Sequence, residues 1–229
     1  MNRGDFLWLV ALCAVSSIML IPSSQQIFIG ATKAHPYAMG FGKFAILATM
    51  GELLSIRIGR GAWKSPAGIT HRAIIWGFIG VLIVLMFEVF SSGVVSAVSK
   101  GLLWSGDVST SKIWTAFWIS AIINFAFAPA FMTLHRITDT YIDLICGENI
   151  PFAEVKLSDV IARIDWQGLV SFVVCKTIPF FWIPAHTITF LLPPEYRVLM
   201  AAYLSIALGA ILSYGKRKKS KSPIQVAVK

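Results

Sequence analysis

The sequence predicts an all-α protein, a polytopic transmembrane bundle of about six membrane-spanning helices. Hydrophobic residues make up 56% of its 229 residues and charged residues only 14%. The mean hydropathy is +0.73. A soluble domain usually carries about a quarter charged residues. Long apolar runs between short polar stretches are typical of helical membrane proteins, because a helix needs about 20 apolar residues to cross the bilayer core.

The net charge of +9 has a distribution typical of a membrane protein. The basic residues gather at the ends of apolar segments, in the stretch 57–72 and in the C-terminal tail 218–229 with the residues just before it. This is the positive-inside pattern, so no nucleic-acid partner is expected. The expected partners are the lipid bilayer and, at the tail, anionic lipid headgroups. The sequence leaves a homo-oligomer open.

The first three apolar segments are each long enough to span a bilayer. Segment 6–21, within an N-terminal region 1–22, is either a transmembrane helix or a signal anchor, and its cleavage stays open. Segment 36–58 begins with a proline, which suits the first turn of a helix. In segment 73–98, small and polar residues recur at three- and four-residue spacing and share one helix face: Gly77, Gly80, Val84, Glu88 and Ser91.

Three more apolar segments follow, with one polar stretch between them. Tryptophans near the start of segment 113–134 are typical of the membrane interface. The polar loop 135–165 holds six acids and three bases, and its apolar residues from Leu157 have the spacing of a short amphipathic helix. The paired prolines Pro193 and Pro194 separate segments 166–192 and 196–214. In the first of these, a kink is expected around Trp182 and Pro184 because proline cannot donate a helical hydrogen bond.

Six crossings place both termini on the positive-inside face. The basic stretch Arg57, Arg60, Lys64 and Arg72 then lies on the same side as the tail and the polar loop. The opposite side carries only scattered bases. No second domain is predicted.

Several short motifs lie between the second segment and the last one. Their residues are His35, Pro36, Gly51, Trp182, Pro184, Phe190, Pro193, Pro194, Tyr196, Arg197, Leu212, Ser213 and Tyr214. With them the chain resembles, over about 34–217, the Mpv-seventeen / 22-kDa peroxisomal membrane protein family. The chain departs from that family's pattern at Glu52, Thr189 and Tyr214, where the family has Asp, Asn and Trp. A distant member, bacterial or otherwise, is therefore expected.

The resemblance implies a family-like core of four to five helices, 34–217, preceded by the added N-terminal segment. It also implies an integral membrane protein proposed to form a channel for small solutes, without established enzyme activity. The expected location is the inner membrane of a bacterium, or a mitochondrial inner or peroxisomal membrane in a eukaryote.

Polar and ionisable residues inside the predicted spans are the candidate site. They are Lys43, Glu52, Glu88, Ser91, Asn124, Lys176 and His186. An unpaired charge at the centre of a membrane helix costs about 2.5–3.5 kcal/mol on insertion scales. These residues are therefore expected either to pair as an ion-pair network that holds the helices together, or to line a polar passage.

Three function classes follow from this pattern. The first is a channel or pore for small solutes or ions. The alternative is a non-conducting membrane scaffold or stress-related structural protein. An intramembrane enzyme comes last, because the sequence contains none of the common metalloprotease, hydrolase or nucleotide-binding motifs. No catalytic residue, metal or cofactor is predicted.

Overall fold

The structure is a computed structural model that describes residues 2–221. Over these residues the chain is helical and has no β-strand. Four helices are long and apolar enough to cross a membrane, or up to five if one bent pair counts as a single span. The all-α class is thus confirmed, and the apolar helices are consistent with a membrane location. Six crossings stay a prediction.

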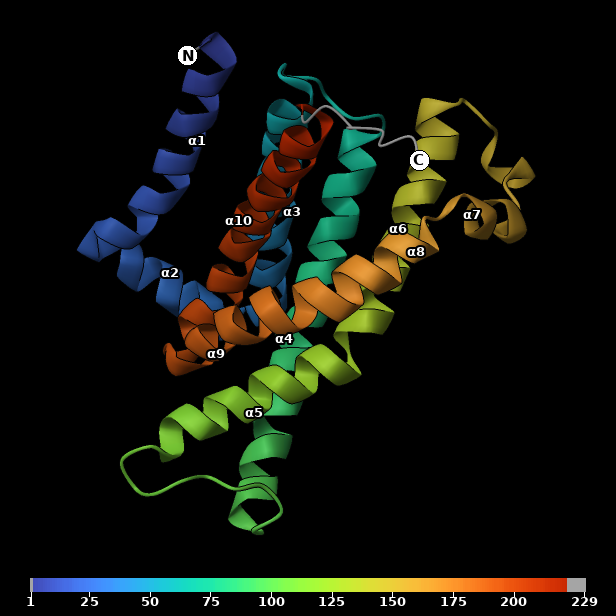
Figure 1. Ribbon diagram of the computed structural model, residues 1–229. Coiled ribbons are helices and arrows are strands. Elements are labelled where there is room, and N and C mark those ends of the chain that lie inside the picture. The colour runs from blue at the N-terminus through green and yellow to red at the C-terminus, as the bar shows by residue number, and fades with distance from the viewer. Residues whose placement is uncertain (1, 222–229) are drawn as a thin grey trace.

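The helices follow one another with short connections (Figure 1). In chain order they are α1 (Arg3–Leu20), α2 (Pro22–Ala34), α3 (Pro36–Arg60), α4 (Ile69–Ser99), α5 (Ser111–Ala126), α6 (Ala128–Ile142), the π-helix η1 (Asp143–Gly147), the 3₁₀ turn η2 (Phe152–Glu154), α7 (Leu157–Arg163), α8 (Trp166–Gly168), the π-helix η3 (Leu169–Trp182), α9 (Ile183–Leu191) and α10 (Pro194–Lys221). The four candidate spans are α1, α3, α4 and the run from α8 to α9, Trp166–Leu191.

Helix α3 lies at the centre, antiparallel to α4 and parallel to α10 (Figure 1). Glycines permit the close approach. A Cβ on Gly80 would lie 2.2 Å from the carbonyl oxygen of Gly40, and a Cβ on Gly51 would lie 3.0 Å from the Cα of Ile206. Gly77, Gly80 and Val84 of the predicted small and polar face therefore pack against α3, whereas Glu88 of the same face is exposed.

The fourth predicted segment is two helices instead of one. Helices α5 and α6 are bent by 47° relative to each other. Pro129 lies in the first turn of α6 and has no N–H to continue the hydrogen bonding of α5. Helix α6 then continues to Ile142, so it occupies the start of the predicted polar loop 135–165. The short amphipathic helix predicted in that loop is present as α7.

The N-terminal segment continues into a second helix. Helix α2 was not predicted; it begins at Pro22, immediately after α1. Hydrogen bonds from three residues of α1 hold it against the central helices. Arg57 Nε donates to Asp5 Oδ1 over 2.8 Å, Trp8 Nε1 donates to the Met50 carbonyl over 3.0 Å, and Ser16 and Tyr203 hydroxyls lie 2.8 Å apart.

The prolines of segment 166–192 are accommodated inside a continuous helical run. Pro179 lies within the π-helix η3, and Pro184 occupies the first turn of α9. Pro179 thus lies in widened turns where the hydrogen-bond register changes, and the kink expected around Trp182 and Pro184 stays a prediction. Pro194 begins α10 after the predicted turn.

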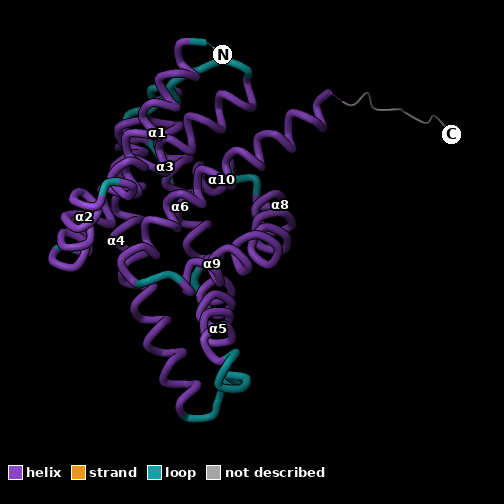
Figure 2. The backbone as a smooth tube through the Cα atoms, turned by 90° about the vertical axis from the view of Figure 1, so that its left-hand side faces the viewer, coloured by secondary structure: helices purple, strands orange, loops and turns teal. Residues whose placement is uncertain are grey.

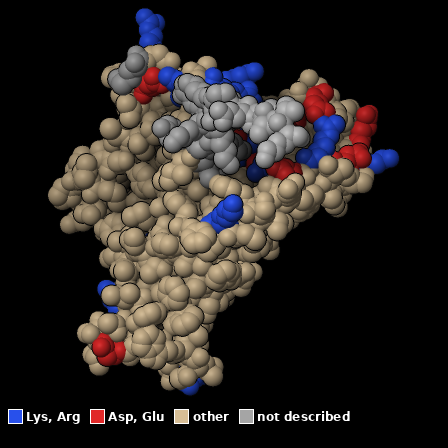
Figure 3. Space-filling model, viewed as in Figure 1, with Lys and Arg blue, Asp and Glu red and all other residues tan. Residues whose placement is uncertain are grey.

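Charge is distributed unevenly over the molecule. Figure 3 shows charged side chains gathered at the upper end of the molecule. Below them in this view, a broad band of the surface is nearly free of charged side chains. The end of α4 and the loop that leads to α5 project beyond the other helices at the opposite end (Figure 2). The beginning of α1 and the last turns of α10 both lie at the end where charge gathers (Figure 1).

Candidate functional site

The seven predicted site residues do not form one cluster. Glu52, Asn124 and His186 line a central cavity, whereas Lys43 and Glu88 line a second cavity. Ser91 and Lys176 line neither of the two cavities.

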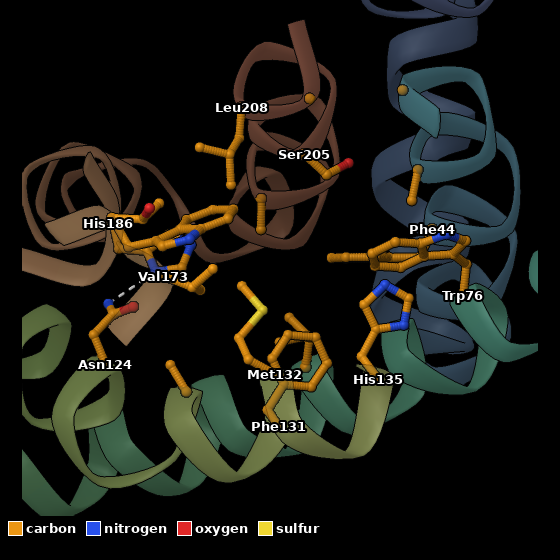
Figure 4. A pocket seen from close by; sticks show the side chains of 18 of the residues that line it. Phe44, Trp76, Asn124, Phe131, Met132, His135, Val173, His186, Ser205 and Leu208 are labelled. Atoms are coloured by element: carbon orange, nitrogen blue, oxygen red, sulfur yellow. Dashed lines mark hydrogen bonds between the residues drawn. The ribbon is translucent and has the colours of Figure 1, made fainter. Parts of the chain in front are cut away.

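The central cavity has a volume of about 300 Å³ and is lined by α3, α4, α5, α6, η3, α9 and α10. Most of its wall is apolar and aromatic. Figure 4 shows Asn124 and His186 at one end, Trp76 and His135 at the other, and Met132 between them. Small-molecule sites have this character, with a few polar groups set in an apolar wall.

A buried hydrogen-bonded pair fixes one end of the central cavity. Asn124 Nδ2 donates to the carbonyl of Ser120 over 2.8 Å and lies 3.0 Å from His186 Nδ1. The Ser120 carbonyl can only accept, so it fixes the orientation of the amide. The same amide nitrogen then donates to Nδ1 of His186, which must be unprotonated. The imidazole proton of His186 therefore lies on Nε2.

Four ring nitrogens on residues that line the central cavity are buried without a hydrogen-bond partner in the described part of the chain. They are Trp76 Nε1, His135 Nδ1, Trp182 Nε1 and His186 Nε2. Buried polar groups in proteins are hydrogen-bonded in the large majority of cases. These nitrogens have almost no accessible surface, so they are packed within the cavity wall and do not face its open space.

The sequence did not predict the ion cluster that includes Glu52 and Asp139, two residues that line the cavity. The Arg72 guanidinium lies 2.9 Å from Glu52, 3.1 Å from Asp139 and 2.6 Å from Asp143. Arg72 Nε also donates to the Ala67 carbonyl over 3.1 Å. Only 6% of Arg72 is exposed, so this cation is held by its partners and not by solvent.

Arg72 was predicted to lie in a basic loop, and Asp139 and Asp143 in a separate polar loop. In the structure Arg72 lies in the first turn of α4, and the extension of α6 with the following η1 carries Asp139 and Asp143 to it. The sequence contained one indication of this contact. The basic stretch 57–72 has no acid, the loop 135–165 has six, and both were predicted to lie on the same side of the membrane.

The second cavity has a volume of about 340 Å³ and is lined by α2 and by parts of α3, α4 and α10. Lys43 is buried; its Nζ donates to Thr32 Oγ1 over 3.0 Å and lies 4.4 Å from the centre of the Phe28 ring. Glu88 is exposed and accepts a hydrogen bond from Ser92 over 2.9 Å.

Arg197 and an exposed ion pair complete the second cavity. Arg197 Nε donates to the Leu192 carbonyl over 3.0 Å, and its guanidinium lies 5.7 Å from the centre of the Phe190 ring. Lys33 and Glu195 form an ion pair of 2.9 Å. The lining of the second cavity therefore includes both basic side chains and carboxylates.

The predicted ion-pair network among the four intraspan charges is not formed. Within residues 2–221, Lys43, Glu52, Glu88 and Lys176 make no ion pair with one another. Glu52 pairs with Arg72 instead. Lys176 is exposed on η3, and the Ser91 hydroxyl is buried without a partner in this part of the chain.

The two cavities share one lining residue. Phe87 lines both of them. It is 5% exposed, and its ring centre lies 4.8 Å from that of Phe190 and 5.7 Å from that of His186. An aromatic cluster of residues from α4 and α9 therefore forms the wall between the cavities.

Three of the residues that carried the family resemblance make structural contacts. His35 and Pro36 form the junction of α2 and α3, and Ser213 hydrogen-bonds to Ser55 across α10 and α3. The predicted motif ends at Leu212 and Tyr214, whose side chains lie outside the described residues, as does the tail 222–229. Over residues 2–221, no group of three or more His, Cys, Asp or Glu residues could hold a metal ion.

Comparison of the chain with protein-family models, curated proteins and solved structures gives no match.

Proposed function

We propose that the protein is a membrane passage for small solutes, and that the structure captures it closed at Phe87. The observation that carries the proposal is that two cavities have one lining residue in common, the buried Phe87. The resemblance to a family proposed to form channels agrees with it.

The helix positions of the lining residues show how the cavities are stacked. On α3 the second cavity ends at Lys43 and the central cavity begins at Phe44. On α10, which is parallel to α3, the second cavity ends at Val198 and the central cavity begins at Ala201. On antiparallel α4 the order is reversed, with Phe87 at the boundary. The two cavities are therefore consecutive along the helix axes.

The chemistry of the two ends also supports a passage. Glu52 and Asp139, which pair with Arg72, line the central cavity, and Glu88 and Arg197 line the second cavity. Polar and charged residues lie toward both ends, whereas the middle is aromatic. Hydrophobic constrictions close membrane pores by excluding water.

The expected membrane arrangement belongs to the same proposal. Helix α10 would serve as a further span beside α3, and the beginning of α1 and the end of α10 would lie on the positive-inside face. The membrane would be a bacterial inner membrane or an organelle membrane.

The test is solute flux through vesicles that contain the Phe87→Ala variant. Shrinking and re-swelling after an osmotic step with glycerol gives the permeability, and we expect Phe87→Ala to raise it above wild type. The matched control is Phe78→Ala, because Phe78 is on the same helix but exposed. Circular dichroism and gel filtration establish that each variant is folded. Vesicles that stay sealed with folded Phe87→Ala would contradict the passage.

A non-conducting scaffold is the second candidate, and the Arg72 cluster favours it. That cluster joins α3, α4, α6 and η1 through one buried cation. Buried ion pairs between helices of this kind hold the helices in one arrangement. Sealed vesicles in the flux experiment, together with a large loss of stability on removal of Arg72, would support this alternative.

A further inference from the structure

We infer that the second cavity binds a compact organic monocarboxylate, whose carboxylate group is held by Arg197 and Lys43. The inference deepens the proposed function, on which it rests, because it names a class of solute that this end of the passage takes up. It is carried by two basic side chains that line one cavity and have hydrogen-bond donors without a protein acceptor.

Arg197 offers donors that are open to solvent. Its Nε donates to the Leu192 carbonyl, and the two terminal nitrogens of the guanidinium make no hydrogen bond within residues 2–221. Arg197 is only partly buried, and neither terminal nitrogen is among the fully buried polar atoms that lack a partner in this part of the chain. Both nitrogens are therefore accessible. A guanidinium binds a carboxylate through two parallel N–H bonds, which is the arrangement these nitrogens leave free.

Lys43 supplies a second cation to the same cavity. It is 7% exposed, and its Nζ donates to Thr32 Oγ1 over 3.0 Å. An ammonium carries three N–H bonds, and this is the one hydrogen bond of Nζ within the described residues. Neither Lys43 nor Arg197 forms an ion pair over residues 2–221. A charge removed from water without a counter-ion is costly, so an anion in this cavity stabilises both cations.

The other charged residues of the lining decide the charge of the ligand. Lys33 and Glu195 neutralise each other in their ion pair of 2.9 Å. Glu88 is the remaining carboxylate, and it is exposed. The two unpaired cations therefore exceed the unpaired carboxylates by one charge. A monoanion balances this difference, whereas a second negative charge would be repelled by Glu88.

Two helix N-termini add to the positive potential of the cavity. Helices α3 and α10 are parallel and both begin there (Figure 1). The lining includes Pro36 and Tyr37 from the start of α3, and Pro194 from the start of α10. The N-terminal end of a helix carries a partial positive charge that attracts anions. The helix ends and the two basic side chains therefore favour a ligand of the same sign.

The apolar part of the wall decides the rest of the ligand. Val84, Leu85 and Phe87 of α4 and Val198 of α10 line the cavity. Its volume of about 340 Å³ is at the lower end of small-molecule sites. A carboxylate attached to one aromatic ring or to a short branched chain therefore fits.

The test uses two probes of nearly equal shape. The probes para-fluorobenzoate and para-fluorobenzamide differ in one carboxylate oxygen, which becomes an NH₂ group. Each is titrated into full-length protein in phosphatidylcholine nanodiscs at neutral pH, and fluorine NMR gives its affinity after subtraction of binding to empty nanodiscs. We expect the carboxylate to bind about tenfold tighter than the amide or better, because hydrogen bonds between charged groups are about twice as strong as neutral ones.

Two variants assign the preference to the cations. Lys43→Met and Arg197→Met keep most of the side-chain length and remove the charge. Each is expected to weaken para-fluorobenzoate about tenfold and to change para-fluorobenzamide by less than about twofold. Lys100→Met is the matched control, since Lys100 is exposed at the end of α4 and lines neither cavity. Circular dichroism and gel filtration establish that each variant is folded.

A third variant gives an effect of the opposite sign. Glu88→Gln removes the unpaired carboxylate of the cavity and should tighten para-fluorobenzoate about threefold. This variant and Lys43→Met decide the question if Arg197→Met, which alters the contact with the Leu192 carbonyl, does not fold.

Three results would overturn the inference. Equal affinity for the two probes in wild type would leave the phosphodiester groups of the surrounding lipid as the partner of the cations. A preference that is unchanged in the folded cation variants would place the carboxylate elsewhere. Weaker binding of para-fluorobenzoate to Glu88→Gln would contradict the balance of charge in the cavity.

This outcome is separable from the outcome of the flux experiment. A preference for para-fluorobenzoate in protein whose Phe87→Ala vesicles stay sealed would establish a binding site without a passage. Glycerol flux in protein that shows no probe preference would retain the passage and refute the assignment of its solute class.

Discussion

The Arg72 cluster gives the sharpest prediction for stability. Arg72→Met keeps the length of the side chain and removes the charge that Glu52, Asp139 and Asp143 share. Asp143 is 65% exposed at its side chain and will be screened by solvent, so it adds little to the cost. Glu52 and Asp139 are 22% and 18% exposed and lose their partner inside the protein.

The magnitude follows from this difference in exposure. Removal of one partner from a buried ion pair typically costs about 3–5 kcal/mol, because the remaining charge is left without compensation. We expect Arg72→Met to lower the free energy of unfolding by that amount. The double variant Arg72→Met/Asp139→Asn should recover part of the loss, since it removes one of the uncompensated carboxylates.

The assay is reversible unfolding in mixed micelles, with the denaturing detergent as titrant and helical circular dichroism as readout. Arg60→Met is the matched control: Arg60 is exposed at the end of α3, and it makes no ion pair within residues 2–221. Surface ion pairs contribute up to about 1 kcal/mol to stability. If Arg72→Met lowered the free energy of unfolding by less than this, the cluster would not be a set of buried ion pairs that stabilises the helix arrangement.

Two further predictions concern the packing of the central helices and the N-terminal helix. Gly80→Ala should destabilise the protein by about 1–3 kcal/mol in the same assay, because its Cβ would lie 2.2 Å from the Gly40 carbonyl oxygen. Gly42→Ala, with nothing within 4 Å, should be neutral or stabilising, and equal effects of the two changes would be inconsistent with tight α3–α4 packing. Asp5→Asn should speed amide hydrogen exchange in the first turns of α1, since Asp5 accepts hydrogen bonds from Arg57 and Trp63. Exchange as slow as in wild type would show that other contacts hold α1.

The apolar runs and glycine spacing of the sequence were enough to predict the central helices. Segments 36–58 and 73–98 coincide with α3 and α4 to within a few residues at each end. The small and polar face of segment 73–98 was predicted because residues three and four positions apart lie on one face of a helix. These features are local, so one chain segment contains all the information they need.

Features that depend on two distant segments could not be predicted in the same way. The partner of Glu52 is Arg72, which was predicted to lie in a loop. That prediction placed the start of the helix at the first apolar residue. In the structure the helix begins earlier and includes Arg72. The bend between α5 and α6 brings the acids of α6 to Arg72, and helical periodicity does not specify such a bend. The pair Asn124 and His186 was predicted as two members of one polar set, and the structure adds their direct contact.

The permeability of Phe87→Ala vesicles tests the central claim most directly. Moving the Phe87 ring out of its aromatic contacts costs about 1.5–3 kcal/mol, which is at least about tenfold in rate. Glycerol permeability of Phe87→Ala should therefore exceed that of both wild type and Phe78→Ala by about tenfold or more. Equal permeability of the three proteins, each shown to be folded, would contradict a passage closed at Phe87.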